Sequence, residues 1–254
     1  MAYPSVRVER SPAIIGNPLP SIVSVALLTA ALGGLLAHQA GWAGAQIMAG
    51  LVAYAAVSGI VAVAVGFERG PAGFGLANQV TLLRAGLVCL IAGVLLAGGT
   101  APLLGWSLTA LVATALSLDA LDGWLARRFG LASAFGARFD LEIDALLILI
   151  LAVLLWQTGR VGPWVLAIGL LRYAFVLAGW LLPWLRQPLP PSRRRQAVCV
   201  QQGITLLLCL LPPVGTTVAT LCAGLALVAL LASFAADIIY LARVRGAPGT
   251  DRWC

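Results

Sequence analysis

Eight long apolar stretches are the feature that most constrains how this chain can fold. Each is bounded by Gly, Pro or Arg, and most are long enough to cross about 30 Å of hydrocarbon as a helix. They run approximately over residues 20–38, 43–66, 79–99, 103–127, 140–158, 162–185, 197–212 and 217–242. Backbone groups in lipid must be satisfied within each segment, and the sequence lacks the alternating ten-residue pattern of a membrane barrel. The sequence therefore predicts an all-α integral membrane protein with about eight transmembrane helices.

The arginines indicate how these helices are oriented. The chain has 16 basic residues, none of them lysine, against 9 acidic ones. Of the arginines outside the predicted spans, all but Arg160 fall on one side of the eight-span arrangement. Positive loops mark the cytoplasmic face, so both termini and the loop between the fourth and fifth spans are predicted to be cytoplasmic. Because the charge is spread over juxtamembrane loops, membrane lipid is an expected partner and nucleic acid is not.

Acidic residues are concentrated in one place, although only 10% of the chain is charged. Five of the nine lie within residues 117–146. Asp119 and Asp122 are three residues apart. Asp140 and Asp144 are four apart, so on helices each pair would share one face. An ionised group at membrane depth costs roughly 2.5 to 3.5 kcal/mol on insertion scales, so such a cluster is normally paired, hydrated or bound to metal. This stretch is therefore the candidate functional site.

Two interpretations without catalysis compete here. The aspartates could pair with Arg127, Arg128 and Arg138 in a structural salt-bridge cluster, or they could line a cation or proton path in a transporter. A transporter site is expected near mid-membrane on interrupted helices, often with an inverted repeat. The acids instead flank a short predicted loop, and no inverted repeat is visible in the sequence.

The spacing within the stretch is specific. It reads D-x₂-D-G-x₂-A-R-x₈-G-x₃-D-x₃-D and comprises Asp119, Asp122, Gly123, Ala126, Arg127, Gly136, Asp140 and Asp144. The pattern resembles the signature of the CDP-alcohol phosphotransferases, membrane enzymes that move a substituted phosphate from a cytidine diphosphate donor to an alcohol. All eight signature identities stand at the family's spacing. The resemblance implies a six-helix catalytic core.

Chemistry supports a metal-binding role for part of this signature. Mg²⁺ and Mn²⁺ prefer oxygen ligands and are held by carboxylates together with phosphate oxygens. Asp119, Asp122 and Asp140 fit that role, in a site for one or two ions. The resemblance assigns Asp144 as the general base that takes the proton from the acceptor hydroxyl. A carboxylate beside a divalent metal stays ionised, which suits that task.

Other signature residues are expected to contact the donor nucleotide and its phosphates. Gly123 and Gly136 lack a Cβ and allow close approach to the backbone, while Ala126 keeps the same face shallow. Arg127 can bridge phosphate oxygens with its planar fork.

A second donor contact is expected upstream. Asn78 and Thr81, in the run ANQVTLLR, resemble the family's Asn and Thr contacts to the nucleotide, although Ala77 stands where a proline often precedes the Asn. The alternative is an ordinary helix start with Asn78 as its N-cap, and both interpretations can hold together.

Downstream arginines indicate an anionic acceptor. Arg172 lies inside the sixth predicted helix, and three consecutive residues, Arg193, Arg194 and Arg195, lie in or near the next cytoplasmic loop. Guanidinium forks bind phosphate well, so a phosphorylated alcohol such as glycerol 3-phosphate or inositol phosphate would explain them. The consecutive arginines are explained equally well by positive-inside anchoring, which makes Arg172 the more informative residue.

Two more acidic residues in the predicted helices are not assigned to the site. Glu142 stands between the last two signature aspartates and points to a different helix face. Asp237 precedes Tyr240 by three residues and Arg243 by six, which predicts a local hydrogen bond or ion pair.

We divide the chain into three parts. Residues 1–77 form a cytoplasmic tail and a two-span N-terminal extension, residues 78–245 form the six-span catalytic core, and residues 246–254 form a second tail. The two added spans are rich in Gly and Ala. Such residues permit close helix packing, either in a homodimer or against a neighbouring helix.

The predicted activity belongs to phospholipid biosynthesis. It is the metal-dependent transfer of a phosphatidyl group from CDP-diacylglycerol to the hydroxyl of a small phosphorylated alcohol, with release of CMP, as in a phosphatidylglycerophosphate or phosphatidylinositol phosphate synthase. We expect a bacterial inner-membrane protein whose active site faces the cytoplasm.

Two alternative functions remain open. One keeps the fold and reverses the partners, with CDP-choline or CDP-ethanolamine donating to diacylglycerol. The other is a cation transporter that uses the same aspartates. Metal-dependent CMP release would count against the transporter, and ion flux without turnover of a CDP-lipid would support it.

Overall fold

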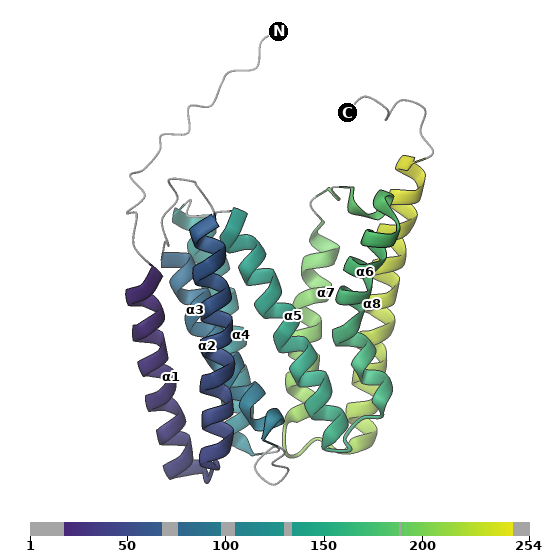
Figure 1. The fold of residues 1–254 in the computed structure, drawn as a ribbon. Coiled ribbons are helices and arrows are strands. Elements are labelled where there is room, and N and C mark those ends of the chain that lie inside the picture. Colours follow the sequence, from purple (N-terminus) through teal and green to yellow (C-terminus); the bar gives the residue numbers. More distant parts are fainter. Residues whose placement is uncertain are drawn as a thin grey trace.

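The computed structural model describes residues 18–67, 76–97, 105–129, 134–187, 189–190 and 192–245. These residues form eight α-helices and two short 3₁₀ turns, and no strand occurs among them. In chain order the elements are α1 (Pro18–Ala40), α2 (Gly44–Phe67), α3 (Leu76–Leu96), α4 (Trp106–Phe129), α5 (Ala134–Gln157), η2 (Pro163–Val165), α6 (Leu166–Leu181), η3 (Pro183–Arg186), α7 (Arg193–Leu210) and α8 (Thr216–Arg245) (Figure 1). One α-helix corresponds to each predicted apolar stretch, so the predicted all-α fold is confirmed.

Two helices begin earlier in the sequence than the apolar stretches that predicted them, because polar residues extend each helix at its start. The fifth stretch was predicted from residue 140, whereas α5 begins at Ala134. The seventh was predicted from residue 197, whereas α7 begins at Arg193. Hydropathy marks the segment suited to lipid, while backbone hydrogen bonding can continue beyond it. As a result, Asp140 lies six residues inside α5 rather than at its first position, and the three consecutive arginines lie inside a helix rather than in a loop.

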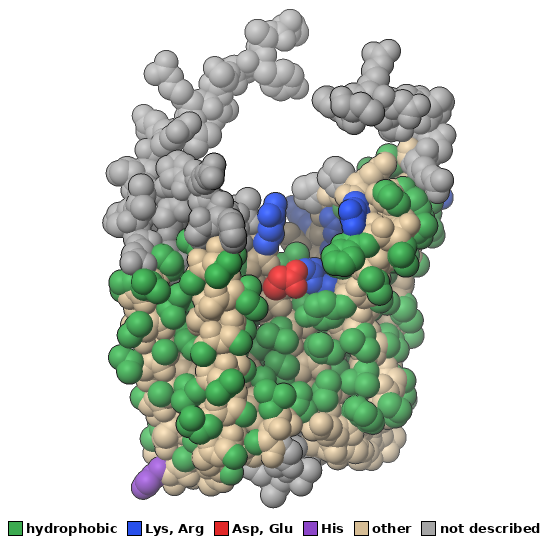
Figure 2. Space-filling view, viewed as in Figure 1, with side chains coloured by type: hydrophobic (Ala, Val, Ile, Leu, Met, Phe, Trp, Pro, Cys, Tyr) green, Lys and Arg blue, Asp and Glu red, His purple; other side chains and the backbone are tan. Residues whose placement is uncertain are grey.

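The outer faces of the helices are apolar. Helices α1, α2, α3 and α8 and the segment Pro163–Leu181 are each long and apolar enough to cross a membrane. Large apolar side chains such as Leu27, Ile60 and Leu225 are exposed on them. Figure 2 shows apolar side chains over most of one face, with charged side chains gathered around a hollow at one end. Such a broad apolar surface suits lipid rather than water.

Helix α3 is the most enclosed of these candidate spans. It packs against α1, α2, α4 and α5. The side chains of Leu82, Val88 and Leu90 are fully excluded from solvent. Figure 1 shows α5 crossing between this group of helices and the group formed by α6, α7 and α8. Residues on α3, α4 and α5 can therefore meet in one place.

Glycines allow the N-terminal helices to pack closely on α3. A Cβ added at Gly93 of α3 would lie 2.2 Å from the carbonyl oxygen of Gln46 in α2. A Cβ added at Gly50 of α2 would lie 2.9 Å from the carbonyl oxygen of Cys89. Only residues without a side chain permit two helix backbones to approach in this way. The close packing predicted for the extension is thus found against a neighbouring helix of the same chain.

Candidate active site

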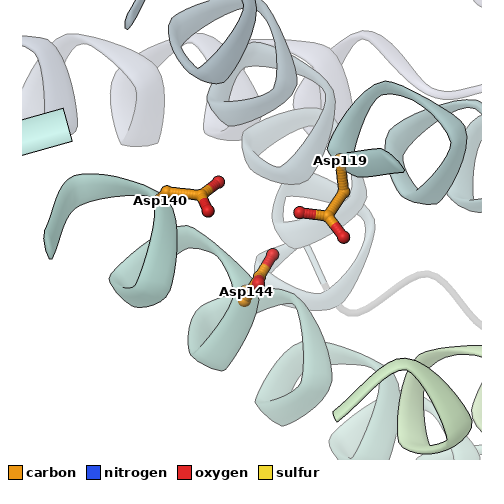
Figure 3. A group of neighbouring side chains, drawn as sticks. All are labelled: Asp119, Asp140 and Asp144. Carbon is orange, nitrogen blue, oxygen red and sulfur yellow. The ribbon is translucent and has the colours of Figure 1, made fainter. Parts of the chain in front are cut away.

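Three signature aspartates converge from two helices. Asp119 lies in the second half of α4, and Asp140 and Asp144 lie one turn apart in the first half of α5. One carboxylate oxygen from each lies within 4.8 Å of the others. Figure 3 shows the three side chains pointing toward one another across the space between α4 and α5. We call this group the Asp triad.

The signature glycines share these helix faces. Gly123 follows Asp119 by four residues on α4, and Gly136 precedes Asp140 by four on α5, so each lies about one turn from a triad aspartate on the same face. Both glycines are partly exposed. The side chains of the other three signature residues, Asp122, Ala126 and Arg127, lie outside the described part of the structure.

A buried arginine that is not part of the signature completes the cluster. Arg84 of α3 has no solvent-exposed surface. Its Nη1 donates to Asp119 Oδ1 at 2.5 Å, and its Nη2 donates to Asp140 Oδ1 at 2.5 Å. The same Nη2 lies 3.0 Å from Asp144 Oδ1 and also donates to the Asp140 backbone carbonyl at 3.2 Å. One guanidinium therefore contacts all three triad carboxylates.

Arg84 is the last residue of the run ANQVTLLR, and the sequence alone assigned it no role in the site. A signal was present, because an arginine within an apolar span is costly unless it has a partner. Its spacing also pointed to the site, since Arg84 follows Thr81 by three residues, the separation that puts two side chains on one helix face. The partners of Arg84 could not be found from spacing alone, because they lie on two other helices.

Asn78 and Thr81 are both buried on α3. They precede Arg84 by six and three residues, so they extend from the triad toward the start of the helix. Helix α3 begins at Leu76, which puts Asn78 inside the first turn. The alternative interpretation of Asn78 as an N-cap is therefore wrong, because a cap residue precedes the first helical one.

Three of the four predicted acceptor arginines pair with carboxylates outside the triad. Arg172 of α6 forms an ion pair with Glu142 of α5. Arg194 and Arg195 in the first turn of α7 contact Asp237 Oδ1 of α8 at 2.5 and 3.3 Å. The predicted local pairing of Asp237 is therefore wrong, since the arginines that contact it come from another helix. These pairs join α5 to α6 and α7 to α8.

The remaining acceptor candidate, Arg193, is exposed at the first position of α7. Three arginines in the first turn of a helix oppose the positive end of its dipole. The carboxylate of Asp237, which is 11% exposed, offsets part of that charge. Arg193 therefore presents its charge to the surroundings.

The donor set of the triad fits a divalent cation. Three carboxylates carry a charge of −3 and Arg84 carries +1, which leaves −2 on the described groups. The aspartate side chains are 31%, 36% and 21% exposed, so the cluster can be reached from outside. Carboxylate oxygens are the ligands that Mg²⁺ and Mn²⁺ prefer. Residual charge, access and ligand type all suit such an ion.

The sequence matches the CDP-alcohol phosphatidyltransferase family over residues 74–246. The chain belongs to this family. No solved structure matches it. The match confirms the resemblance drawn from the signature and the prediction of an enzyme, since this is a membrane-integral family of transferases for substituted phosphate groups.

Membership gives this CDP-alcohol phosphatidyltransferase its general chemistry. The family transfers a phospholipid headgroup phosphate between a CDP-alcohol and an acceptor alcohol, and it depends in general on divalent metal. The Asp triad is compatible with such a metal. The broad apolar surface and the family together identify an integral membrane protein, as predicted.

Proposed function

We propose that the enzyme transfers the phosphatidyl group of CDP-diacylglycerol to the hydroxyl of a small phosphorylated alcohol and releases CMP. The observation that carries this proposal is the convergence of Asp119, Asp140 and Asp144 between α4 and α5 of an apolar bundle, in a member of this family. A lipid-linked donor suits a site that opens beside a lipid-facing surface. Basic side chains near the acids in Figure 2 favour an acceptor that carries phosphate.

Asp119, Asp122 and Asp140 would hold the metal, as one or two ions of Mg²⁺ or Mn²⁺. When bound, the metal supplies positive charge that neutralises the pyrophosphate and the charge that develops during transfer. Asp144 would act as the general base. Because an oxygen of Asp144 also lies within 4.8 Å of the other two, its role as base rather than ligand requires a separate test.

The transfer step conserves bonds and charge. Asp144 accepts the proton of the acceptor hydroxyl as the acceptor oxygen forms a bond to the phosphatidyl phosphorus. The bond from that phosphorus to the bridging oxygen breaks, and CMP leaves with the electron pair. Alignment of the two substrates supplies much of the rate, since phosphoryl transfer needs mainly positioning and charge neutralisation.

The remaining residues would orient the substrates. We assign the donor nucleotide and phosphates to a group drawn from α3, α4 and α5, consisting of Asn78, Thr81, Gly123, Ala126, Arg127 and Gly136. We assign the acceptor phosphate to Arg172, Arg193, Arg194 and Arg195. Engaging the acceptor would then require Arg172 to share its charge with Glu142, and Arg194 and Arg195 to share theirs with Asp237.

We also propose the division into a two-helix extension and a six-helix catalytic core over residues 78–245. The family match from residue 74 to residue 246 supports it. The positive-inside pattern supports a cytoplasmic active site, because basic and acidic side chains gather at the same end of the bundle (Figure 2). A bacterial inner membrane is the compartment proposed.

CMP release by the purified chain in lipid nanodiscs tests the function. CDP-diacylglycerol and Mg²⁺ or Mn²⁺ are supplied with glycerol 3-phosphate, inositol phosphate, inositol, serine or choline in parallel. Release that depends on a phosphorylated acceptor supports the proposal and identifies the product. Release with an uncharged or cationic acceptor alone would contradict the acceptor assignment while keeping the donor.

The alternatives give different results in the same preparation. A reversed reaction would show CMP release from CDP-choline or CDP-ethanolamine with diacylglycerol and none from CDP-diacylglycerol. A chain that binds no CDP-alcohol and carries cations across the membrane would contradict the enzymatic proposal altogether.

A further inference from the structure

Arg84 occupies the centre of the polar cluster although the signature does not include it. It has no exposed surface, and its guanidinium contacts one oxygen of each triad carboxylate. It comes from α3, whereas the carboxylates come from α4 and α5. A partly buried carboxylate cluster without a counter-charge is disfavoured, because like charges repel and part of their hydration is lost. Arg84 therefore stabilises the arrangement that the triad adopts in this structure.

The same oxygens are the ones that offer a metal site. Asp119, Asp140 and Asp144 each contribute one oxygen to a group that spans no more than 4.8 Å. Arg84 lies 2.5, 2.5 and 3.0 Å from an oxygen of these three residues. A divalent cation held by these carboxylates would therefore lie close to the guanidinium. Two positive groups that share one set of carboxylates repel each other and divide the negative charge between them.

We propose that Arg84 is an internal counter-ion that competes with the divalent metal for the Asp triad. It is a positioning residue, since it acts through the carboxylates. It keeps the triad assembled before metal binds, and by the same charge it lowers the affinity of the triad for metal. Binding linkage makes the effect reciprocal, so metal weakens the hold of Arg84 on the aspartates. This inference rests on the metal site proposed above.

A second buried arginine provides a matched control. Arg160 is 8% exposed, and its Nη1 donates to the backbone carbonyls of Cys209, Leu211 and Val214 at 3.1, 2.8 and 2.9 Å. Those partners are neutral carbonyls at the C-terminal end of α7 and the turn that follows. Arg160 therefore stabilises the fold through hydrogen bonds to backbone carbonyls of residues outside the triad.

Thermal unfolding of the full chain in nanodiscs, with and without Mn²⁺, measures the competition. Arg84→Met removes the charge and keeps an unbranched side chain. Metal-free Arg84→Met should melt below wild type. Mn²⁺ should raise its melting temperature by more than that of wild type, because stabilisation by a ligand grows as its dissociation constant falls. Free Mn²⁺ measured by electron paramagnetic resonance should give a dissociation constant lower by about tenfold or more, from the Coulomb repulsion removed.

Two variants separate a counter-ion from a residue that merely fills space. Arg160→Met should lower the melting temperature but leave the Mn²⁺-induced shift at its wild-type size. The double variant Arg84→Met with Asp119→Asn removes one positive and one negative charge, so its metal-free melting temperature should exceed that of Arg84→Met alone. If Arg84→Met folds only in Mn²⁺, the inference is supported, and the double variant should then fold without metal.

The results that would contradict this inference differ from those that would contradict the metal site itself. An Mn²⁺-induced shift that is the same in Arg84→Met and wild type, or weaker Mn²⁺ binding in the variant, would overturn the role of Arg84 and leave the metal site standing. A double variant no more stable than Arg84→Met would do the same. Absence of any Mn²⁺ effect on wild type would overturn the proposed metal site, and the inference with it.

Discussion

Replacing Gly93 with alanine should force α2 and α3 apart. The new Cβ would lie 2.2 Å from the carbonyl oxygen of Gln46, 2.6 Å from the nitrogen of Gly50 and 2.9 Å from its Cα. All three atoms belong to the backbone of α2, so no side-chain rotation can relieve the overlap. Carbon–oxygen contacts between neighbouring backbones are rarely shorter than about 3.3 Å, so α2 must retreat by about 1 Å.

The cost follows from that overlap. Forcing an extra methyl group into a packed interface typically destabilises a protein by about 1–3 kcal/mol. Alanine is more favourable than glycine within a helix by roughly 0.5–1 kcal/mol, which offsets part of that cost. Because the overlap is with backbone atoms, we expect a cost of about 2–3 kcal/mol and a net loss of about 1–2.5 kcal/mol, which corresponds to a few degrees of melting temperature for a chain of this size.

Thermal unfolding in nanodiscs, followed by intrinsic fluorescence, measures this loss. Gly59→Ala on α2 is the control, because Gly59 is exposed and a Cβ there meets nothing within 4 Å. The control should melt at or slightly above the wild-type temperature. If Gly93→Ala melted with the control, the close approach of α2 to α3 would be refuted.

Three further predictions concern the active site, and each has its own readout. Asp144→Asn should abolish CMP release while leaving metal-dependent nucleotide binding largely intact, and full activity would exclude Asp144 as the base. Asp122→Ala should lose both properties, and metal affinity equal to wild type would remove Asp122 from the ligand set. Arg172→Gln should raise KM for a phosphorylated acceptor roughly tenfold or more, the loss expected for one charge-assisted hydrogen bond. KM for the donor should not change. An equal rise in both KM values would argue against contact between Arg172 and the acceptor.

The fold could be predicted largely because lipid imposes a strong rule on sequence. Apolar stretches separated by Gly, Pro and Arg gave one helix each, since a backbone in hydrocarbon has few alternatives to a helix. Helix ends were less predictable. Pro163 and Pro183 begin the two 3₁₀ turns that flank α6, and hydropathy alone does not predict these turns. The three consecutive arginines lie within α7 because backbone hydrogen bonding continues where apolarity stops.

The spacing of the aspartates along the chain was enough to predict that they share helix faces. Asp140 and Asp144 lie four residues apart on a continuous helix, and helical periodicity alone puts both on one face of it. The family signature could be recognised from the sequence for the same reason, since it is a local pattern on two consecutive helices. Sequence thus determined the helices of the protein and the aspartates of its polar cluster.

Tertiary structure decided the partners of those charges. Arg84 meets the triad from a helix 35 residues upstream of Asp119, and Arg194 meets Asp237 across 43 residues. Such contacts depend on how each helix is rotated about its axis and on which helices are neighbours, and neither property is encoded in local spacing. Sequence requires a buried charge in an apolar chain to find a partner, but only the packed arrangement of helices selects which one, because the energy of the pair depends on distance in space.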